Sequence, residues 1–167
     1  MSMDHVTKND IYAELIQTGV GKGYCVIPEF RVGLEGGKRN KNIDLVWATR
    51  KSSTDMRQNC ESLKYWTLHA TFEIDACDVR NIPGKEFNRH VCDLPNIKNI
   101  DPGQSICHFI VLYTSAHDRN WNHRRNVEVD VALRKKWANG TVINVLDGRD
   151  LFVVHGLPTI CRDDTAL

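Results

Sequence analysis

Two apolar stretches of this chain carry acidic side chains, and that combination restricts the fold more than any other feature. Ile43–Thr49 contains Asp44, and Tyr65–Asp75 contains Glu73 as well as its final residue, Asp75. Both stretches are rich in β-branched or aromatic residues, which predicts strands. Because alternate side chains of a strand share a face, we expect Glu73 and Asp75 to point together while the residues next to them enter the core.

These acids need partners if the strands lie in a core. Burying an uncharged polar group without a partner costs roughly 2–7 kcal/mol, and burying a charge costs more. Carboxylates on neighbouring strands also raise one another's pKa unless a cation lies among them. Hard oxygen ligands of this kind suit Mg²⁺. The alternative is that each acid leaves the core at a strand end and pairs with Lys or Arg.

The rest of the pattern predicts an α/β fold, with a mixed central sheet flanked by helices, in one domain over residues 1–167. A capping box at residues 7–10 begins a first helix, which ends at the glycines that start with Gly19. The strand expected over 24–32 contains Pro28, which argues for an edge position or a bulge. Further apolar patterns predict a helix over 83–94, a strand over 106–114 and a helix over 121–137.

Two expectations concern the end of the chain. Helical spacing places one set of side chains of the last helix toward the core: Val129, Ala132, Leu133 and Trp137. The Asp147–Gly148 pair that follows predicts a hairpin between strands over 141–146 and 151–155.

The composition excludes several classes of protein. With 22 Lys and Arg against 21 Asp and Glu, the net charge of +1 does not fit a histone-like binder, so a nucleic-acid contact needs a local patch. The six cysteines form no CxxC pair and the histidines no HExxH motif, so we expect reduced cysteines and no zinc site. No apolar run is long enough to span a membrane, and no secretory pattern begins the sequence, so we expect a cytoplasmic protein without a membrane partner.

The order of the acid-bearing segments resembles that of a known enzyme family. Glu14 lies in the first helix, the strand Gly23–Arg31 reads GYCVIPEFR, and the strands with Asp44 and with Glu73 follow. This pattern, over about residues 7–115, resembles the core of the PD-(D/E)xK nuclease superfamily. The resemblance implies a restriction-endonuclease-like fold in which Asp44 and Glu73 hold Mg²⁺, with Mn²⁺ as a possible substitute. Glu14 matches the acid of the first helix that many members use.

One position departs from the superfamily pattern. The residue two places after the motif Glu is usually Lys and is Asp75 here, and Ile43 stands before the motif Asp. Some members take the cation from the following helix, where Lys85 is the candidate and Arg80 a nearer rival. The resemblance therefore implies a catalytic set that is completed from that helix: Asp44, Glu73, Asp75 and Lys85.

Three basic regions are candidates for contact with nucleic-acid phosphates. The turn between the first two strands carries Lys38, Arg39 and Lys41, although a solvated hairpin tip explains the same charges. Arg89 lies one helical turn after Lys85. The segment after the strand over 106–114 adds three further side chains, for which the start of a helix packed by a Trp is the alternative: Arg119, Arg124 and Arg125.

The function expected from these features is metal-dependent hydrolysis of phosphodiester bonds in DNA by an endonuclease. RNA stays open as a substrate, and the family analogy favours a homodimer that cuts both strands. The alternative is a catalytically inactive module of nuclease fold that binds nucleic acid or a protein partner, because the motif Lys is missing. A third interpretation is an unrelated α/β protein whose acids only make salt bridges.

Overall fold

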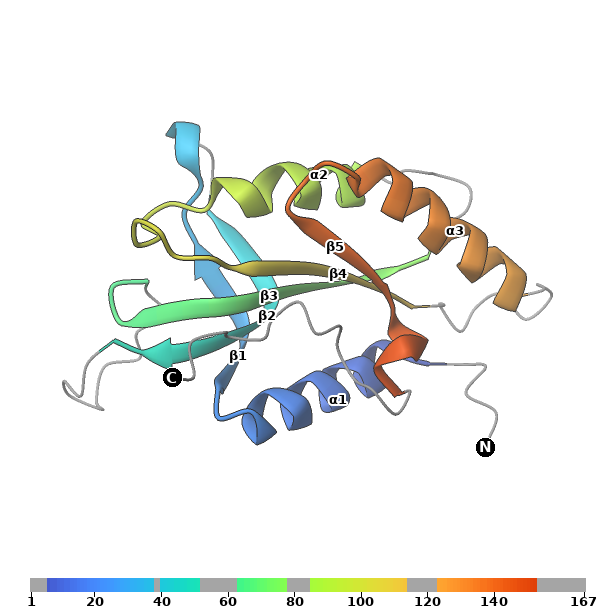
Figure 1. Ribbon diagram of the computed structural model, residues 1–167, viewed down its shortest axis with the longest axis horizontal. Coiled ribbons are helices and arrows are strands. Elements are labelled where there is room, and N and C mark those ends of the chain that lie inside the picture. Colours follow the sequence, from blue (N-terminus) through green and yellow to red (C-terminus); the bar gives the residue numbers. More distant parts are fainter. Residues whose placement is uncertain (1–5, 38–39, 52–62, 78–84, 114–122, 153–167) are drawn as a thin grey trace.

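The computed structural model describes residues 6–37, 40–51, 63–77, 85–113 and 123–152. A mixed sheet runs through the middle of the molecule, with helices above and below it (Figure 1). The elements in chain order are α1 (Lys8–Gly21), β1 (Cys25–Val32), η1 (Glu35–Gly37), β2 (Lys41–Arg50), β3 (Trp66–Ala76), α2 (Lys85–Asp93), η3 (Leu94–Asn96), β4 (Cys107–Tyr113), α3 (His123–Ala138), β5 (Ile143–Asp147) and η4 (Gly148–Phe152).

The five strands lie in the sheet in the same order as in the chain, β1-β2-β3-β4-β5. The pairs β1–β2 and β2–β3 are antiparallel, whereas β3–β4 and β4–β5 are parallel. Antiparallel neighbours can be joined by short turns, but parallel neighbours need a crossover, which α2 and α3 provide. The prediction of an α/β fold with a mixed central sheet flanked by helices is confirmed.

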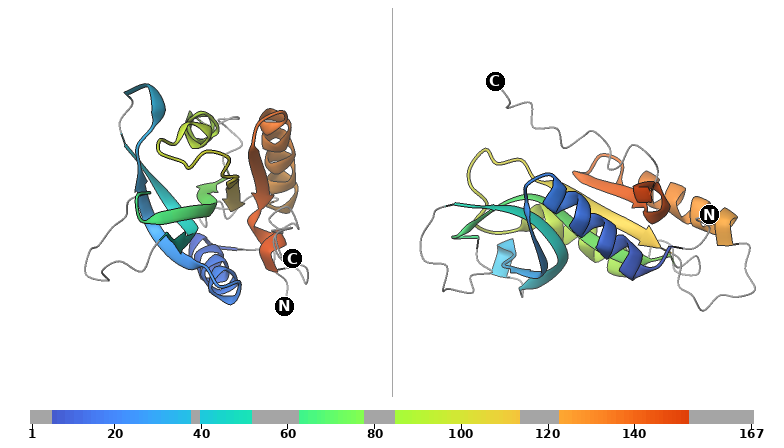
Figure 2. Two further views of the ribbon diagram at one scale, coloured as in Figure 1. Left: turned by 60° about the vertical axis from the view of Figure 1, so that its left-hand side comes forward. Right: turned by 90° about the horizontal axis from the view of Figure 1, so that it is seen from below.

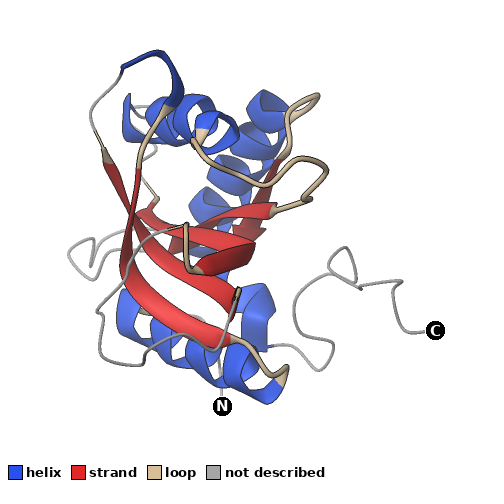
Figure 3. Cartoon of the chain, turned by 90° about the vertical axis from the view of Figure 1, so that its left-hand side faces the viewer, coloured by secondary structure: helices blue, strands red, loops and turns tan. Residues whose placement is uncertain are grey.

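Helices lie on both faces of the sheet (Figures 2 and 3), and the buried apolar side chains form two separate clusters. On one face, α1 buries Ile11 and Leu15 against Trp47 and Phe72. On the other face, α2 and α3 cover the sheet with apolar side chains that include Phe87. A polar functional site is therefore expected where the strands carry polar side chains, between these two apolar layers.

Local chemistry explains where α1 begins and how closely it packs. Thr7 and Asp10 form the expected capping box, in which each side chain bonds the backbone N–H of the other residue. Gly19 is buried on the sheet side of the helix, and a Cβ there would lie 2.7 Å from Val26 Cγ2 and 2.8 Å from Trp47 Cδ1. The absence of a side chain at this position allows the helix to approach β1 and β2.

The first strand confirms the interpretation of its proline. β1 is an edge strand, and Pro28 is exposed there. The next residue, Glu29, has a φ of 50°, a left-handed conformation that interrupts the strand. No helix in the described residues is long and apolar enough to span a membrane.

The C-terminal part corrects two expectations. In α3, Val129 and Trp137 are exposed, so the predicted inward face is wrong. The buried face carries Val131, Ala138 and an ion pair, in which Arg134 Nε lies 2.9 Å from Asp130 Oδ1. A spacing analysis that assigns the core to apolar residues alone misses a helix that buries a charge pair.

The hairpin expected around Asp147–Gly148 is also absent from the described part of the chain. Residues 148–152 form the short helix η4, while 153–155 lie outside the described residues. Gly148 packs so closely on α1 that a Cβ would lie 2.6 Å from Ile11 Cδ1.

Gly19→Ala tests the close approach of α1 to the sheet. We expect the added methyl group to lower the free energy of unfolding by about 1–3 kcal/mol, because Trp47 and Val26 must move. Urea unfolding followed by circular dichroism measures the change. Gly21→Ala is the matched control two residues later, because no atom lies within 4 Å of its Cβ position. Equal effects of the two substitutions would contradict the packing role of Gly19.

Candidate functional site

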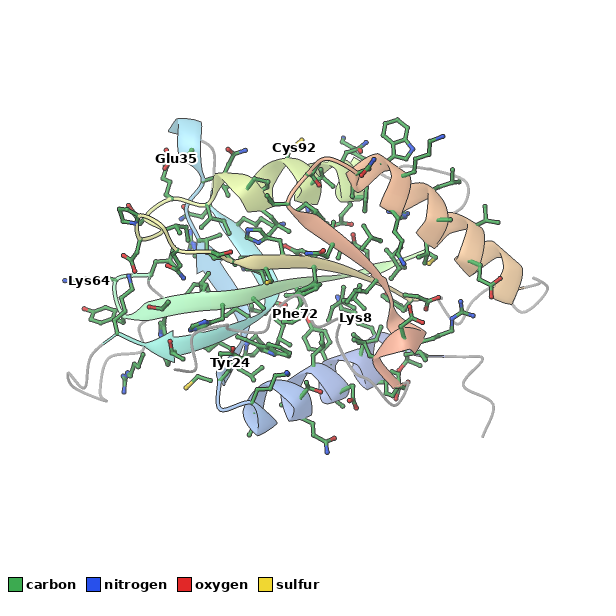
Figure 4. The ribbon with its side chains drawn as sticks, viewed as in Figure 1. Lys8, Tyr24, Glu35, Lys64, Phe72 and Cys92 are labelled. Atoms are coloured by element: carbon green, nitrogen blue, oxygen red, sulfur yellow. The ribbon has the colours of Figure 1, made fainter. Side chains whose placement is uncertain are left out.

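Asp44 lies at an irregular point of β2. Its Oδ2 accepts a hydrogen bond from the backbone N–H of Ile74 at 2.7 Å, so the carboxylate takes the place of a strand carbonyl. On the α1 side, Tyr12 donates to the Asp44 carbonyl oxygen at 3.4 Å, and Lys8 Nζ lies 3.8 Å from Asp44 Oδ1. Lys8 extends from the start of α1 toward the sheet (Figure 4). These contacts fix the orientation of the carboxylate between β3 and α1.

Glu73 and Asp75 point to the other face of the sheet, toward α2. Their shared orientation follows the strand alternation expected from the sequence, since Phe72 and Ile74 belong to the core under α1. His90 of α2 meets both acids: its Nδ1 lies 3.5 Å from Glu73 Oε1 and its Nε2 lies 3.2 Å from Asp75 Oδ1.

Lys41, the first residue of β2, completes this group. Its Nζ lies 2.8 Å from Glu73 Oε1 and 2.7 Å from His90 Nδ1. The side chains of Lys41 and Glu73 are only 8% and 3% exposed, which makes this a buried ion pair. We call Lys41, Glu73, Asp75 and His90 the charged tetrad.

The hydrogen-bonding capacity of the tetrad determines the state of His90. A lysine ammonium group has only donors, so His90 Nδ1 must accept from Lys41. The other ring nitrogen then carries the proton and donates to Asp75 Oδ1. In this arrangement the imidazole of His90 connects the cation beside Glu73 to the second carboxylate.

Burial controls the electrostatics of the site. Removal from water raises the pKa of Glu73 above its ordinary value, although His90 and Lys41 act in the opposite direction and favour the charged form. Burial also raises the pKa of the Tyr12 hydroxyl, and the negative charge of Asp44 adds to that effect. The phenol is therefore a hydrogen-bond donor toward the Asp44 backbone at neutral pH.

The acids open onto a hollow of about 660 Å³ between the sheet and α2. Acidic and basic side chains both reach it. Its lining is formed by Lys8, Arg31, Leu34, Asn40, Lys41, Asn42, Asp44, Glu73, Ile74, Asp75, Ala76, Glu86, Arg89, His90, Asp93 and Tyr113. We call it the acidic hollow. Asp44, Glu73 and Asp75, which were predicted from separate strands, thus reach one space.

The carboxylates that reach the acidic hollow are hard oxygen donors, the kind of ligand that Mg²⁺ takes in proteins. Within the described ranges no three His, Cys, Asp or Glu side chains form a ready-made cage for an ion. Mg²⁺ needs no such cage, because it commonly binds one or two carboxylates and completes its shell with water and phosphate oxygens. Asp75 Oδ2 is buried without a hydrogen-bond donor among the described residues, whereas Glu73 Oε1 has the ion-pair contact with Lys41.

Two predicted site residues do not reach the acidic hollow. Glu14 is half-buried on α1, where it accepts a hydrogen bond from Thr18 at 3.3 Å. Lys85 is exposed at the first residue of α2 and is not among the residues that line the hollow. Arg89 does line it, next to Glu86, whose Oε1 lies 3.1 Å from Arg89 Nη2.

Several basic candidates lie where the structure does not describe them. Lys38, Arg39, Arg80 and Arg119 are outside the described residues. Arg124 and Arg125 belong to α3, but their side chains are not described. Their expected contacts with nucleic acid remain predictions.

The sequence analysis misjudged Lys41 and overlooked His90. Lys41 was expected at a basic turn, in contact with phosphates or with solvent, whereas its side chain is buried against Glu73. His90 was not singled out, although it lies three residues after Phe87 and four before Leu94, on the buried face of the same helix. The spacing of the apolar residues therefore contained a signal for His90, while Lys41 depends on the pairing of β2 with β3.

Comparison of the chain with family models, curated proteins and solved structures gave no match. The chemical interpretation of the site therefore rests on its own residues. They are a carboxylate on β2, two carboxylates on β3, and a buried Lys–His pair between them.

Lys41→Met tests the buried ion pair. Removing the cation leaves Glu73 buried and unpaired, so we expect a loss of about 3–5 kcal/mol in the free energy of unfolding. Adding Glu73→Gln to Lys41→Met should recover part of this loss, because no uncompensated charge then remains beside the missing ammonium group. Urea unfolding of the four proteins in the double-mutant cycle measures the coupling.

The matched control is the exposed pair on α2. Arg89→Met removes a cation from Glu86 at the surface and should change the free energy of unfolding by less than about 1 kcal/mol. A loss from Lys41→Met no larger than this, or strictly additive losses in the cycle, would show that Lys41 and Glu73 do not form a buried pair.

Proposed function

We propose that this protein is a metal-dependent endonuclease that hydrolyses phosphodiester bonds in DNA. The observation that carries the proposal is the buried lysine, Lys41, held 2.8 Å from Glu73 in the hollow that Asp44 and Asp75 also reach. In the PD-(D/E)xK resemblance a lysine belongs beside the motif glutamate. Lys41 supplies that cation from the start of β2, in place of the residue that is Asp75 here.

The order of the elements supports the same proposal. A helix, an edge strand, a strand with Asp44 and a strand with Glu73 follow one another in the chain, and the three strands lie side by side in the sheet. This is the order that the restriction-endonuclease-like resemblance implies. Lys85, which is exposed at the start of α2, is replaced by Lys41 in our assignment of the catalytic cation.

Asp44 and Glu73 are the proposed metal-holding carboxylates, with Asp75 as a third oxygen donor. Bound Mg²⁺ supplies Lewis-acid stabilisation of the negative charge that develops on the phosphate. Lys41 adds a fixed positive charge in a site largely removed from water, where such a charge acts more strongly than in solution. Lys8, which lines the hollow on the α1 side, is a second cation available to a phosphate.

His90 is a positioning residue in this proposal. Its Nδ1 accepts from Lys41 and its Nε2 faces Asp75, so it determines the directions of both side chains. The chain thus provides carboxylate oxygens, the buried ammonium group of Lys41, and the imidazole of His90 between Lys41 and Asp75.

One observation favours a second candidate function, a catalytically inactive module that binds nucleic acid. Glu73 and Asp75 already have cationic or hydrogen-bonding partners from the chain itself, in Lys41 and His90. A site whose carboxylates are satisfied in this way is stable without a metal ion. Such a module would bind nucleic acid equally well in EDTA and would not cleave it.

Cleavage of plasmid and single-stranded DNA in Mg²⁺ or Mn²⁺ tests the proposal. Asp44→Asn is the decisive variant, because an amide oxygen can still accept the Ile74 hydrogen bond while the charge is lost. We expect the cleavage rate to fall by about 100-fold or more, the scale of losing one electrostatic group from an active site.

Glu86→Gln is the matched control, since it removes an exposed carboxylate from the lining of the same hollow. This control should cleave DNA like the wild type. Wild-type rates in Asp44→Asn would contradict the site assignment. Absence of cleavage by the wild type in either metal, together with binding that survives EDTA, would establish the inactive module instead.

A further inference from the structure

We infer that the strand of nucleic acid leaving the acidic hollow lies in a second, basic hollow, where Arg31 and Lys98 hold its phosphates. The inference rests on the proposed function and extends it by naming the surface that holds the substrate next to the cleaved bond. It concerns Arg31 and Lys98, which do not belong to the charged tetrad and which the sequence analysis did not name as nucleic-acid contacts.

The second hollow adjoins the first. It has a volume of about 470 Å³ and shares two lining residues with the acidic hollow, Arg31 and Asn40. Its remaining lining is formed by Val32, Gly33, Lys51, Leu63, Lys64, Lys98, Asn99 and Asp101. We call it the basic hollow. A ligand can therefore pass from one space to the other across Arg31 and Asn40.

Most of the charged side chains that line the basic hollow are positive. Four of its lining residues are basic and one, Asp101, is acidic. Lys51 Nζ lies 2.6 Å from Asp101 Oδ2, which leaves a net positive charge from the other basic side chains. The whole chain has a net charge of only +1, so this excess is local. A local patch of this kind is what the composition requires of any nucleic-acid binder.

The segments that line the basic hollow are joined by backbone pairing. Its floor is the end of β1, and a bridge between Leu34 and Ile97 joins the residues after β1 to those after η3. The backbone N–H of Lys98 donates to the Gly33 carbonyl at 2.9 Å, which fixes the base of the Lys98 side chain. Lys64, which also lines the hollow, lies two residues before β3 at the edge of the molecule (Figure 4).

Arg31 is oriented at the junction between the two hollows. With the amide oxygen of Asn40 turned toward it, that oxygen accepts from both Arg31 Nε and Arg31 Nη2 at 3.1 Å. The guanidinium edge bonded to Asn40 is thereby fixed, and the rest of the exposed group can meet an anion. A planar guanidinium pairs with the two oxygens of a phosphate, so this position suits a nucleic-acid backbone.

The ligand class follows from the continuity of the two spaces. A substrate cleaved near Asp44 and Glu73 carries further phosphates on each side of the scissile bond, at regular intervals along the strand. Five acidic and four basic side chains line the acidic hollow, whereas one acidic and four basic side chains line the basic hollow, so the basic hollow attracts the flanking phosphates more strongly. The strand is therefore directed along β1 toward Lys98 rather than along α2, where Glu86 and Asp93 lie.

Binding of a fluorescein-labelled DNA duplex and of its single strand, measured by anisotropy in EDTA, tests the inference without cleavage. The double variant Arg31→Gln/Lys98→Gln should weaken binding about tenfold or more and lower the slope of log affinity against log salt by about 2. Lys22→Gln/Lys136→Gln is the control with the same change of charge at exposed residues outside both hollows, and it should bind like the wild type.

Each outcome bears on the inference separately from the nuclease assay. Wild-type affinity and salt dependence in Arg31→Gln/Lys98→Gln would overturn the inference while leaving metal-dependent cleavage intact. An equal loss in the control variant would overturn it too, since only net charge would then matter. Loss of binding in the first variant, with no cleavage by the wild type, would support the basic hollow and reject the nuclease. Absence of binding by the wild type would reject both.

Discussion

The buried contact between Lys41 and Glu73 is the constraint on which the site depends. A carboxylate that is 3% exposed on a central strand is stable only with a partner, and Lys41 provides it from the neighbouring strand. The lysine in turn sets His90 through a second contact at 2.7 Å, and His90 orients Asp75. Three elements of the fold, β2, β3 and α2, are thus linked through one charged group.

The two layers of helices give the acids different surroundings. Asp44 is oriented from the α1 side by Lys8 and Tyr12, whereas Glu73 and Asp75 face α2. Alternation along β3 keeps the apolar side chains in the core under α1 and the acids on the other face. The Asp44 carboxylate on β2 bonds the Ile74 backbone of the neighbouring strand β3, and it borders the same hollow as Glu73 and Asp75.

The sequence was sufficient to predict the α/β class and the shared face of Glu73 and Asp75, because both follow from the period of side chains along a strand. It was not sufficient for Lys41, whose burial depends on which residue of β2 lies beside Glu73. It was misleading for Trp137 and Val129, which are exposed because α3 buries the Asp130–Arg134 ion pair. Apolar spacing predicts helices well, but it assigns the wrong face when a helix buries charge. Lys85, at the start of α2, is not among the residues that line the hollow.

The central claim is that the carboxylates around Lys41 form a divalent-cation site. A crystal structure of the protein soaked in Mn²⁺, with anomalous data collected near the manganese edge, tests that claim most directly. The account predicts an anomalous peak in the acidic hollow, in contact with carboxylate oxygens of Asp44 and Glu73 or Asp75, while Lys41 remains beside Glu73. A fully occupied manganese peak elsewhere would contradict the claim. The absence of a manganese peak from the acidic hollow, in crystals where the charged tetrad keeps its contacts, would contradict it as well.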